Sequence, residues 1–513
     1  MPDVTAPAPW WQTAVVYQVY PRSFADADGD GIGDLEGVRQ RLDHLAWLGV
    51  DAVWLSPFYP SPMHDFGYDV ADYCDVDPLF GSLETFDRLV ADAADRGIRV
   101  IVDLVPNHTS SEHPWFVASR SSRNDPKRDW YVWRDGGGPD EPPNNWVGAF
   151  IEGGRAWTWD EPTQQWYLHQ FLPEQPDLNW ENPEVREAMH DVMRFWLDRG
   201  VAGFRIDVVH CIGRDQDFPD DEPPWVGIPH CAINEHPSTH EHIREMRRMV
   251  DGYGGDPVLI GETALPGTHW VAPYYGDGDE LHLAFNFAAT HAPWDAERWR
   301  HRIVRLQEEL DPRGAWPTWV LSNHDISRHR TRYGGSEARA RAAAVALLTQ
   351  RGTPFLYAGE ELGLEDAEVP PERVVDPGGR DGCRAPIPWE SAPGHGWGPD
   401  PWLPFPPDAA ERAAEAQRED DASILHLYRR LLAARRGSPA LQLGSLELLD
   451  APAGALAWRR RHDDDERTTV LNQSDQPVQV ALSGIVEVAS DGCGEGAPFS
   501  GVVPPDSAVL LRP

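Results

Sequence analysis

Eight short β-rich runs alternate with amphipathic stretches through most of the chain, and this repeat constrains the fold more than any other feature. The runs are almost continuously apolar, as expected for strands buried on both faces of a parallel sheet. They cover residues 15–24, 51–59, 99–107, 201–209, 257–263, 281–289, 318–325 and 352–360. Repeated βα units predict an α/β fold, a (β/α)₈ TIM barrel, with reactive residues at the carboxyl ends of the strands.

Two of the amphipathic stretches predict helices of ordinary length. Residues 35–49 place their apolar side chains on one helical face. Residues 82–97 do the same between Ser82, a candidate N-cap, and Gly97, a candidate C-terminal stop. The sequence therefore predicts one helix in each stretch.

Two segments fall outside the βα repeat and divide the chain into three domains. Residues 108–180 are rich in Trp, Asn, Pro and Gly and are too long for a simple βα loop, so we expect an inserted subdomain over the barrel mouth. Residues 438–513 contain only short strand-like runs, which predict an antiparallel β-sandwich. The barrel is then formed by 1–107 and 181–437.

The charge and cysteine content exclude several classes of partner. A formal net charge of -38 repels nucleic acid and anionic membrane surfaces. No apolar run is long enough to span a bilayer, and the N-terminus lacks the pattern of a secretory signal. Five cysteines, odd in number and without a C-x-x-C pair, indicate reduced thiols. We expect a cytoplasmic protein, either a monomer or a homodimer.

Three carboxylates each follow a predicted strand. Asp207, Glu262 and Asp325 close the fourth, fifth and seventh runs. A carboxylate in such a place is costly to bury without a partner, and active sites of barrels lie at these strand ends. A buried structural ion pair would explain any one of these carboxylates, but three of them, each following a predicted barrel strand, favour a catalytic site.

Two carboxyls in different protonation states are what the cleavage of a glycosidic bond requires. One must be ionised to attack the anomeric carbon, and the other must hold a proton for the leaving oxygen, which calls for a raised pKa. Arg205 would face the same side of the strand as Asp207 and keep that carboxyl ionised. Asp207 is thus the candidate nucleophile, and Glu262 the candidate general acid/base.

The motifs around these residues resemble a known enzyme family. DLVPNHTS, GFRIDVVH, LIGET and SNHD resemble, in order, the four signature regions of the α-amylase superfamily, glycoside hydrolase family 13. QPDLNW at 175–180 is similar to a further region of its α-glucosidase and oligo-1,6-glucosidase subgroup. The resemblance implies that Asp207 is the nucleophile, Glu262 the acid/base and Asp325 a third carboxylate that binds ring hydroxyls.

The same resemblance implies a set of sugar-binding residues. His108 and His324 would bind the sugar in the first subsite, and Arg205 matches the arginine beside the nucleophile, although a structural role is the alternative for each histidine. HDFGYDV at 64–70 resembles the region of exo-acting members in which an aspartate pairs with an arginine of a late loop. Here the pair would be Asp65 with Arg380, or less favourably Arg384, and Tyr68 would stack under the sugar ring.

One acidic loop has the spacing of a calcium site. Asp26, Asp28, Asp30 and Asp34 stand at alternate positions around the Ile32 carbonyl, with Gly31 at the bend. The loop is not an EF-hand, because its twelfth position is Gly37, but it is similar to the loop of subgroup members with one structural Ca²⁺. A solvated turn is the alternative. The histidines His230, His236, His240 and His242 lack a metal spacing, so no zinc is expected.

The expected function is a retaining, exo-acting α-glucosidase that acts through a covalent glucosyl-enzyme on short oligosaccharides or disaccharides. Val208 resembles the residue of members that prefer α-1,6 bonds, but the choice between α-1,4 and α-1,6 stays open. One alternative is a transglucosylase or isomerase of the trehalose or isomaltulose synthase type. Another is an inactive carbohydrate-binding homologue.

Overall fold

The computed structural model describes residues 8–149, 154–221 and 236–513. Eight parallel strands form the central sheet in the order β10-β11-β1-β2-β3-β7-β8-β9, a nearly closed barrel that confirms the predicted fold class. Each strand lies within one predicted run: β1 (Val16–Val19), β2 (Ala52–Leu55), β3 (Arg99–Leu104), β7 (Gly203–Ile206), β8 (Val258–Gly261), β9 (Leu283–Ala284), β10 (Thr318–Val320) and β11 (Thr353–Tyr357).

The barrel closes between β9 and β10 through side chains. The Thr318 hydroxyl donates to the Ala284 carbonyl, and the Thr290 hydroxyl donates to the Val320 carbonyl, each at 2.8 Å. Hydroxyl donors replace the backbone ladder here because β9 is only two residues long.

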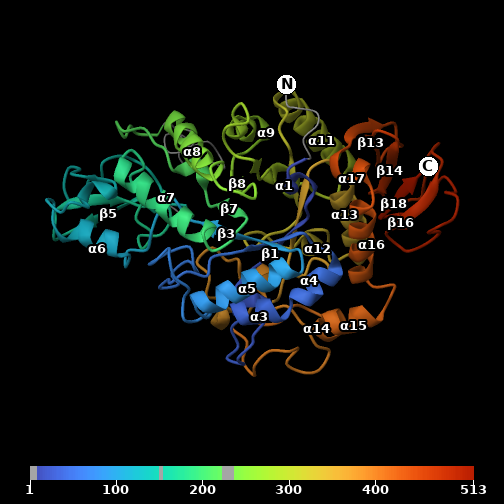
Figure 1. Cartoon of the computed structure of the whole chain (residues 1–513), viewed down its shortest axis with the longest axis horizontal. Helices are drawn as coiled ribbons and strands as arrows, with labels where there is room; N and C mark the ends of the chain where they lie inside the picture. Colours follow the sequence, from blue (N-terminus) through green and yellow to red (C-terminus); the bar gives the residue numbers. More distant parts are fainter. Residues whose placement is uncertain (1–7, 150–153, 222–235) are drawn as a thin grey trace.

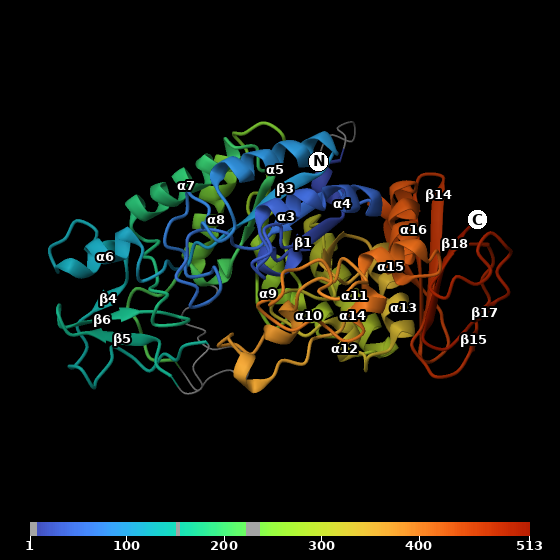
Figure 2. The same cartoon turned by 90° about the horizontal axis from the view of Figure 1, so that it is seen from below.

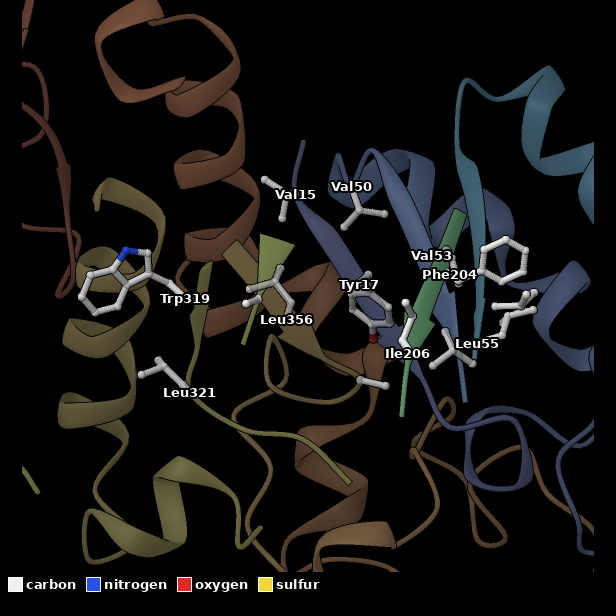
Figure 3. Packing of buried hydrophobic residues seen from close by; sticks show 14 of the residues in the cluster. Val15, Tyr17, Val50, Val53, Leu55, Phe204, Ile206, Trp319, Leu321 and Leu356 are labelled. Atoms are coloured by element: carbon white, nitrogen blue, oxygen red, sulfur yellow. The ribbon is translucent and has the colours of Figure 1, made fainter. Parts of the chain in front are cut away.

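Helices surround the sheet (Figure 1), and apolar side chains of the strands pack in a large core with them (Figure 3). Tyr17, Leu55, Phe204, Ile206 and Leu356 contribute to this core from four different strands, and all are fully or almost fully buried. The larger helices are α5 (Leu83–Asp95), α7 (Pro183–Leu197), α8 (Pro237–Val250), α11 (Ala296–Leu310), α13 (Glu337–Thr349) and α16 (Ile424–Arg436). Shorter ones are α1 (Trp10–Thr13), α2 (Pro21–Phe24), α9 (Thr268–Val271), α12 (His329–Arg332), α14 (Ala409–Arg412), α15 (Ala414–Glu419) and α17 (Pro439–Leu443).

The predicted helix at 82–97 is confirmed as α5, with the Ser82 hydroxyl accepting from the Thr85 amide and Gly97 at φ +71°. The predicted single helix at 35–49 is wrong: it is divided into α3 (Leu35–Gln40) and α4 (Leu42–Leu48). The break falls at Arg41, which leaves helical geometry and stacks its guanidinium on Trp389, 4.5 Å from the ring centroid.

The predicted strand at 281–289 is wrong in its second half. It ends at Ala284, and Phe287–Thr290 form the short helix α10. A brief apolar run suits a buried strand and a buried helical turn equally well, so the pattern alone could not separate the two.

The segment 108–180 contains the helix α6 (Pro114–Ser121) and an antiparallel sheet in the order β4-β6-β5. These strands are β4 (Trp133–Arg134), β5 (Trp157–Asp160) and β6 (Gln165–Leu168), and they lie at one end of the molecule (Figure 2). A buried ion pair from Arg214 to Asp177, 2.7 Å long, joins this segment to the loop after β7. The insertion is thereby held against the carboxyl ends of the barrel strands.

The C-terminal strands form a separate unit at the opposite end (Figures 1 and 2). An antiparallel five-stranded sheet, in the order β12-β13-β14-β18-β16, packs with the two-stranded sheet β15-β17. The bounds are β12 (Ser445–Leu449), β13 (Ala455–His462), β14 (Asp465–Asn472), β15 (Val478–Gln479), β16 (Ile485–Ala489), β17 (Val502–Val503) and β18 (Ser507–Arg512). Within the described part of the chain, no helix has the length and apolar character needed to cross a bilayer.

Candidate active site

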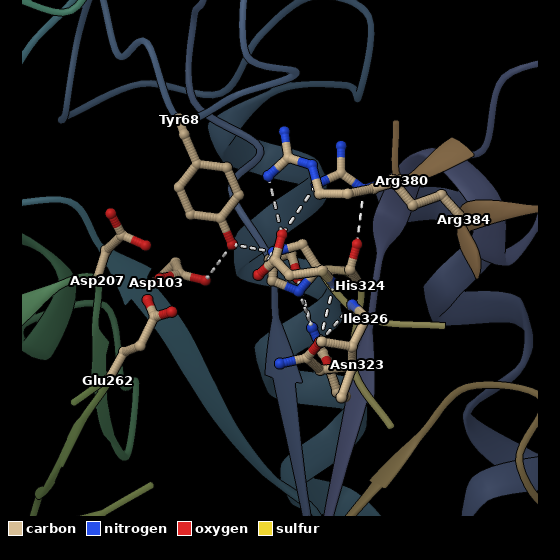
Figure 4. Close-up of polar contacts among 12 residues, drawn as sticks. Tyr68, Asp103, Asp207, Glu262, Asn323, His324, Ile326, Arg380 and Arg384 are labelled. Carbon is tan, nitrogen blue, oxygen red and sulfur yellow. Dashed lines mark hydrogen bonds and ion pairs between the residues drawn. The ribbon is translucent and has the colours of Figure 1, made fainter. Parts of the chain in front are cut away.

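Asp103, Asp207 and Glu262 lie close together near the ends of β3, β7 and β8 (Figure 4), and all three contact the buried guanidinium of Arg205. Arg205 Nη1 donates to Asp207 Oδ1 at 2.8 Å and to Asp103 Oδ1 at 2.7 Å. Arg205 Nη2 donates to Glu262 Oε2 at 2.5 Å. Since one guanidinium binds both Asp207 and Glu262, the two predicted catalytic carboxyls lie close together on the same side of the barrel.

The single guanidinium of Arg205 is shared by three carboxyls, those of Asp103, Asp207 and Glu262. Burial raises the pKa of Asp207 well above its usual range, and repulsion from Glu262 and Asp103 adds to the shift, although Arg205 opposes it. Carboxyls that interact this closely titrate as a unit. Arg205 therefore lowers the pKa of Asp207 but does not fully offset the effect of burial.

Asp325, the third predicted carboxyl, is bound by two arginines, unlike Asp207, which shares one with two other carboxyls. Its Oδ1 accepts from Arg380 Nη1 at 3.0 Å and from Arg384 Nη2 at 3.1 Å. Burial acts to raise its pKa, but the two arginines outweigh burial and lower it. Asp325 is thus held as a carboxylate. It stands five residues beyond the end of β10, on a turn in which Asn323 Oδ1 accepts from the Asp325 amide, rather than at the strand end as predicted.

His324 and Tyr68 form a stacked pair beside Asp325. Their ring planes differ by 8° with centroids 5.5 Å apart, and the Tyr68 hydroxyl lies 2.6 Å from His324 Nε2. Burial lowers the pKa of His324 to about 3, so the ring is neutral. His324 and Arg205 are fully buried, at 0% and 1% exposure, and lie beneath the pocket surface rather than in it.

His108 lies on the side of the site that faces the insertion. Its Nε2 is 3.1 Å from Gln175 Nε2, and its ring packs against Phe171 with centroids 5.1 Å apart. Burial lowers the pKa of His108 to about 4. A neutral imidazole here can hydrogen-bond a sugar hydroxyl without adding charge.

Asp65 and Arg380 close one end of the site. Arg380 Nη2 donates to Asp65 Oδ1 at 2.6 Å, so the favoured partner of the predicted pair is the one in contact. Arg384 instead donates to Asp325 and to the His324 carbonyl. Both members of the Asp65–Arg380 pair are largely buried, which makes a rigid wall.

These groups line a pocket of about 330 Å³. That volume is in the range of small-molecule sites. The lining residues are Asp65, Tyr68, His108, Phe171, Asp207, Val208, Glu262, Ala264, Asp325, Gly378 and Arg380. All three predicted catalytic carboxyls therefore open into one cavity.

Three functional residues were missed by the sequence reasoning. Asp103 binds Arg205 and interrupts the apolar run of β3, a signal of the kind that identified Asp207. Burial raises the pKa of Asp103 to about 6. Gln175 donates to Asp65 Oδ2 at 3.1 Å, and Asp376 accepts from Arg380 Nη2 at 2.6 Å. Gln175 begins the QPDLNW motif, whereas Asp376 carries no sequence signal of its own.

The acidic loop brings some of its carboxylates together. One oxygen each of Asp26, Asp28 and Asp34 lies within 4.8 Å of the others. Asp30 Oδ1 instead accepts from the Ile32 amide, and Asp34 Oδ1 accepts from the Gly37 amide as the N-cap of α3. Hard carboxylate oxygens at this spacing fit a calcium ion.

Gly31 occupies the bend of this loop, at φ +92°, and a Cβ there would lie 2.2 Å from the Asp400 carbonyl oxygen. His236, His240 and His242 make no metal-binding group within the described residues, and His230 lies outside them.

Comparison with known proteins agrees with this geometry. A family model described as the alpha-amylase catalytic domain matches residues 18–444. A probable alpha-glucosidase of Rhizobium meliloti is 42% identical, with 91% of this chain and 90% of that protein covered. An oligo-1,6-glucosidase of Parageobacillus thermoglucosidasius is 38% identical, with 86% of each chain covered.

Among solved structures, the alpha-glucosyl transfer enzyme XgtA has a TM-score of 0.92 and 40% identity, and covers 99% of this chain and 100% of its own. The trehalulose synthase MutB of Pseudomonas mesoacidophila has a TM-score of 0.92 at 34% identity, with 99% and 100% covered.

Proposed function

Because the chain belongs to the alpha-amylase family, we propose that it is a retaining, exo-acting α-glucosidase that hydrolyses α-1,4 and/or α-1,6 bonds at the non-reducing end of short oligosaccharides or disaccharides. The single observation that supports this most strongly is the placing of Asp207 and Glu262 on one guanidinium in a pocket with a closed end. Retaining glycosidases need their two carboxyls about 5–5.5 Å apart. A shared arginine suits that short spacing better than the wider gap of inverting enzymes.

The reaction divides into two displacements. Asp207 attacks the anomeric carbon while Glu262 gives its proton to the leaving oxygen, and a covalent glucosyl-enzyme forms. Glu262 then takes a proton from water as the water attacks the same carbon. Asp325 remains anionic throughout because Arg380 and Arg384 bind it, so it can accept hydrogen bonds from ring hydroxyls.

A substrate panel with product identification tests this proposal. The panel contains isomaltose, maltose, trehalose, sucrose and an aryl α-glucoside. We expect free glucose with initial retention of the α-anomer. Val208 supports a preference for α-1,6 bonds, which predicts a higher kcat/KM on isomaltose than on maltose. Release of β-glucose, or no cleavage of any member, would reject the proposal.

A second candidate is glucosyl transfer to a sugar or alcohol hydroxyl in place of water. It is favoured by the 40% identity and near-complete structural match to an alpha-glucosyl transfer enzyme. The same glucosyl-enzyme serves both reactions, so the ratio of transfer to hydrolysis products at high maltose or sucrose concentration decides between them.

The closed end of the pocket predicts a strong effect of Asp65. We expect Asp65→Asn to lower kcat/KM on disaccharides by about 10²-fold, because Arg380 loses one carboxylate and the terminal glucose is misplaced. Steady-state kinetics on isomaltose measure this. Asp95→Asn, at an exposed position of α5, is the matched control and should leave kcat/KM unchanged. Equal kinetics of the two variants would contradict a role for Asp65 in binding the terminal sugar.

We further propose one structural Ca²⁺ held by Asp26, Asp28, Asp30, Asp34 and the Ile32 carbonyl. Three of the carboxylates already converge, and Gly31 lets the loop bend tightly against the segment around Asp400. Oxygen ligands alone are what Ca²⁺ prefers. The ion would neutralise like charges and fix the start of α3, which Asp34 caps.

Calcium removal is therefore expected to lower stability. A ligand that binds only the folded state stabilises it by mass action, so EDTA should lower Tm by about 2–5 °C, and added CaCl₂ should restore it. Differential scanning calorimetry measures this, and Asp28→Asn should abolish most of the response. An identical Tm of the unmutated protein with EDTA and with CaCl₂ would contradict the site.

We propose a reducing compartment such as the cytoplasm for this protein. Among the described residues, Cys74, Cys383 and Cys493 form no disulfide, and burial raises the pKa of Cys383 to about 12, which keeps its thiol protonated. Fractionation of cells that express the protein, followed by immunoblotting, tests the proposal.

A further inference from the structure

Val208 directly follows the nucleophile and has an unusual backbone conformation. Its φ and ψ are 33° and 45°, in the left-handed region. Valine is β-branched, and such residues rarely adopt positive φ. The side chain lines the pocket and is only 9% exposed. Strain of this kind persists only where the surrounding structure enforces it, and it is frequent at active sites.

The turn that Val208 begins contacts Glu262 at three points. The Val208 amide donates to Glu262 Oε2 at 3.2 Å. The Val209 amide donates to the Glu262 carbonyl at 3.2 Å, and His210 Nδ1 lies 3.3 Å from the same carbonyl. The Cys211 amide donates back to the Val208 carbonyl at 2.8 Å and closes the turn. The left-handed residue thus ties the strand of Asp207 to both the main chain and the carboxyl of Glu262.

Glu262 Oε2 receives two donors, the Val208 amide and Arg205 Nη2. A proton on this oxygen would face both of them, so a protonated Glu262 carries its proton on the other oxygen, Oε1. We propose that Val208 is a positioning residue for Glu262: its amide, with Arg205, keeps Oε2 as the acceptor, so that Oε1 carries the proton toward the leaving group.

This proton transfer from Glu262 rests on the proposed α-glucosidase function. The Oε1–H bond breaks and the proton passes to the glycosidic oxygen, which keeps the electron pair of the broken C1–O bond. An Asp207 oxygen forms the new bond to C1. In the second displacement Oε1 takes a proton from water as the hydroxyl group replaces Asp207 at C1.

A change confined to the Val208 amide leaves the other charges around Glu262 in place. The ionisable groups that face Glu262 are Arg205 in β7, Asp207 directly after it, His210 and Cys211 in the turn, and Asp103 in β3. None of them is altered when one N–H is removed, so a shift in the titration of Glu262 would report the Val208 contact.

The test is an ester in place of the Val208 amide, made by incorporating α-hydroxyvaline into the full chain. Loss of a donor to a carboxylate raises its pKa. We expect the basic limb of kcat/KM on an aryl α-glucoside to move up by roughly half to one pH unit. At the optimum kcat should fall about 3- to 10-fold, with KM unchanged.

The matched control is the same ester at Val209, whose amide binds the Glu262 carbonyl and not its carboxyl. It should leave the basic limb in place. Val208→Gly, which keeps the amide but frees the turn, should move the limb by less, and Val208→Ala should not move it. An active enzyme whose limb is unmoved by the Val208 ester, or moved equally by both esters, overturns the positioning role alone. An unmutated protein that cleaves no α-glucoside overturns the proposed function itself.

Discussion

Asp207→Asn is expected to lower kcat on isomaltose and on aryl α-glucosides by roughly 10⁴- to 10⁶-fold, the scale at which loss of an enzymic nucleophile acts. An amide cannot form the glucosyl ester, so both displacements are lost with every substrate. The amide oxygen of asparagine can still accept from Arg205 Nη1, which now binds Asp207 at 2.8 Å. Tm should therefore stay close to that of the unmutated protein, and the loss is chemical rather than structural.

Mass spectrometry after incubation with a fluorinated glucosyl fluoride, which slows the second displacement, gives a direct measurement. The unmutated protein should carry one added fluoroglucosyl group on the peptide that contains Asp207, and the variant none. Asp217→Asn is a suitable control, because Asp217 is an exposed aspartate on the loop that follows. A labelled Asp207→Asn variant, or one with more than a tenth of the original kcat, would place the nucleophile elsewhere.

The barrel could be predicted from the sequence because eight buried strands leave continuous apolar runs. The break at Arg41 could not be predicted, because Arg41 stacks on Trp389, almost 350 positions away, and no helical periodicity reports such a contact. The short β9 shows the same limit, since its closure depends on hydroxyls of Thr290 and Thr318.

The site was predictable wherever a charged residue follows an apolar run. Asp207 and Glu262 follow β7 and β8 directly, and their positions came from that pattern alone. Asp103 obeys the same rule within β3, so its omission was avoidable. Gln175 stands in the QPDLNW motif, but its contact with Asp65, like that of Asp376 with Arg380, joins loops that meet only in three dimensions.

The pKa of Asp207 depends on all the charges around Arg205, not on Arg205 alone. Arg205 two residues before Asp207 suggested an ionised nucleophile, yet that guanidinium is divided among three carboxyls. A pairwise contact inferred from spacing cannot report how many other acids share the same cation.

Glu262→Gln is expected to show a loss that depends on the leaving group. General acid catalysis contributes about 10²- to 10⁴-fold, so kcat/KM on isomaltose, whose leaving sugar needs a proton, should fall by that factor. With α-glucosyl fluoride or a dinitrophenyl α-glucoside, which leave unaided, the first displacement should proceed nearly as before. The glucosyl-enzyme then accumulates, because glutamine cannot deprotonate water, and KM falls together with kcat.

Azide should rescue this variant, since it attacks the glucosyl-enzyme without a general base. Chromatography should show α-glucosyl azide, with retained configuration, as the product. Rescue with inverted product would instead mean that azide enters in place of an absent nucleophile, which is the behaviour expected of Asp207 variants without their carboxylate. Glu241→Gln, at an exposed position of α8, should hydrolyse all substrates normally. A Glu262→Gln variant that loses the same factor on every leaving group, and gains nothing from azide, would remove Glu262 from the acid/base role and leave it only the binding of Arg205.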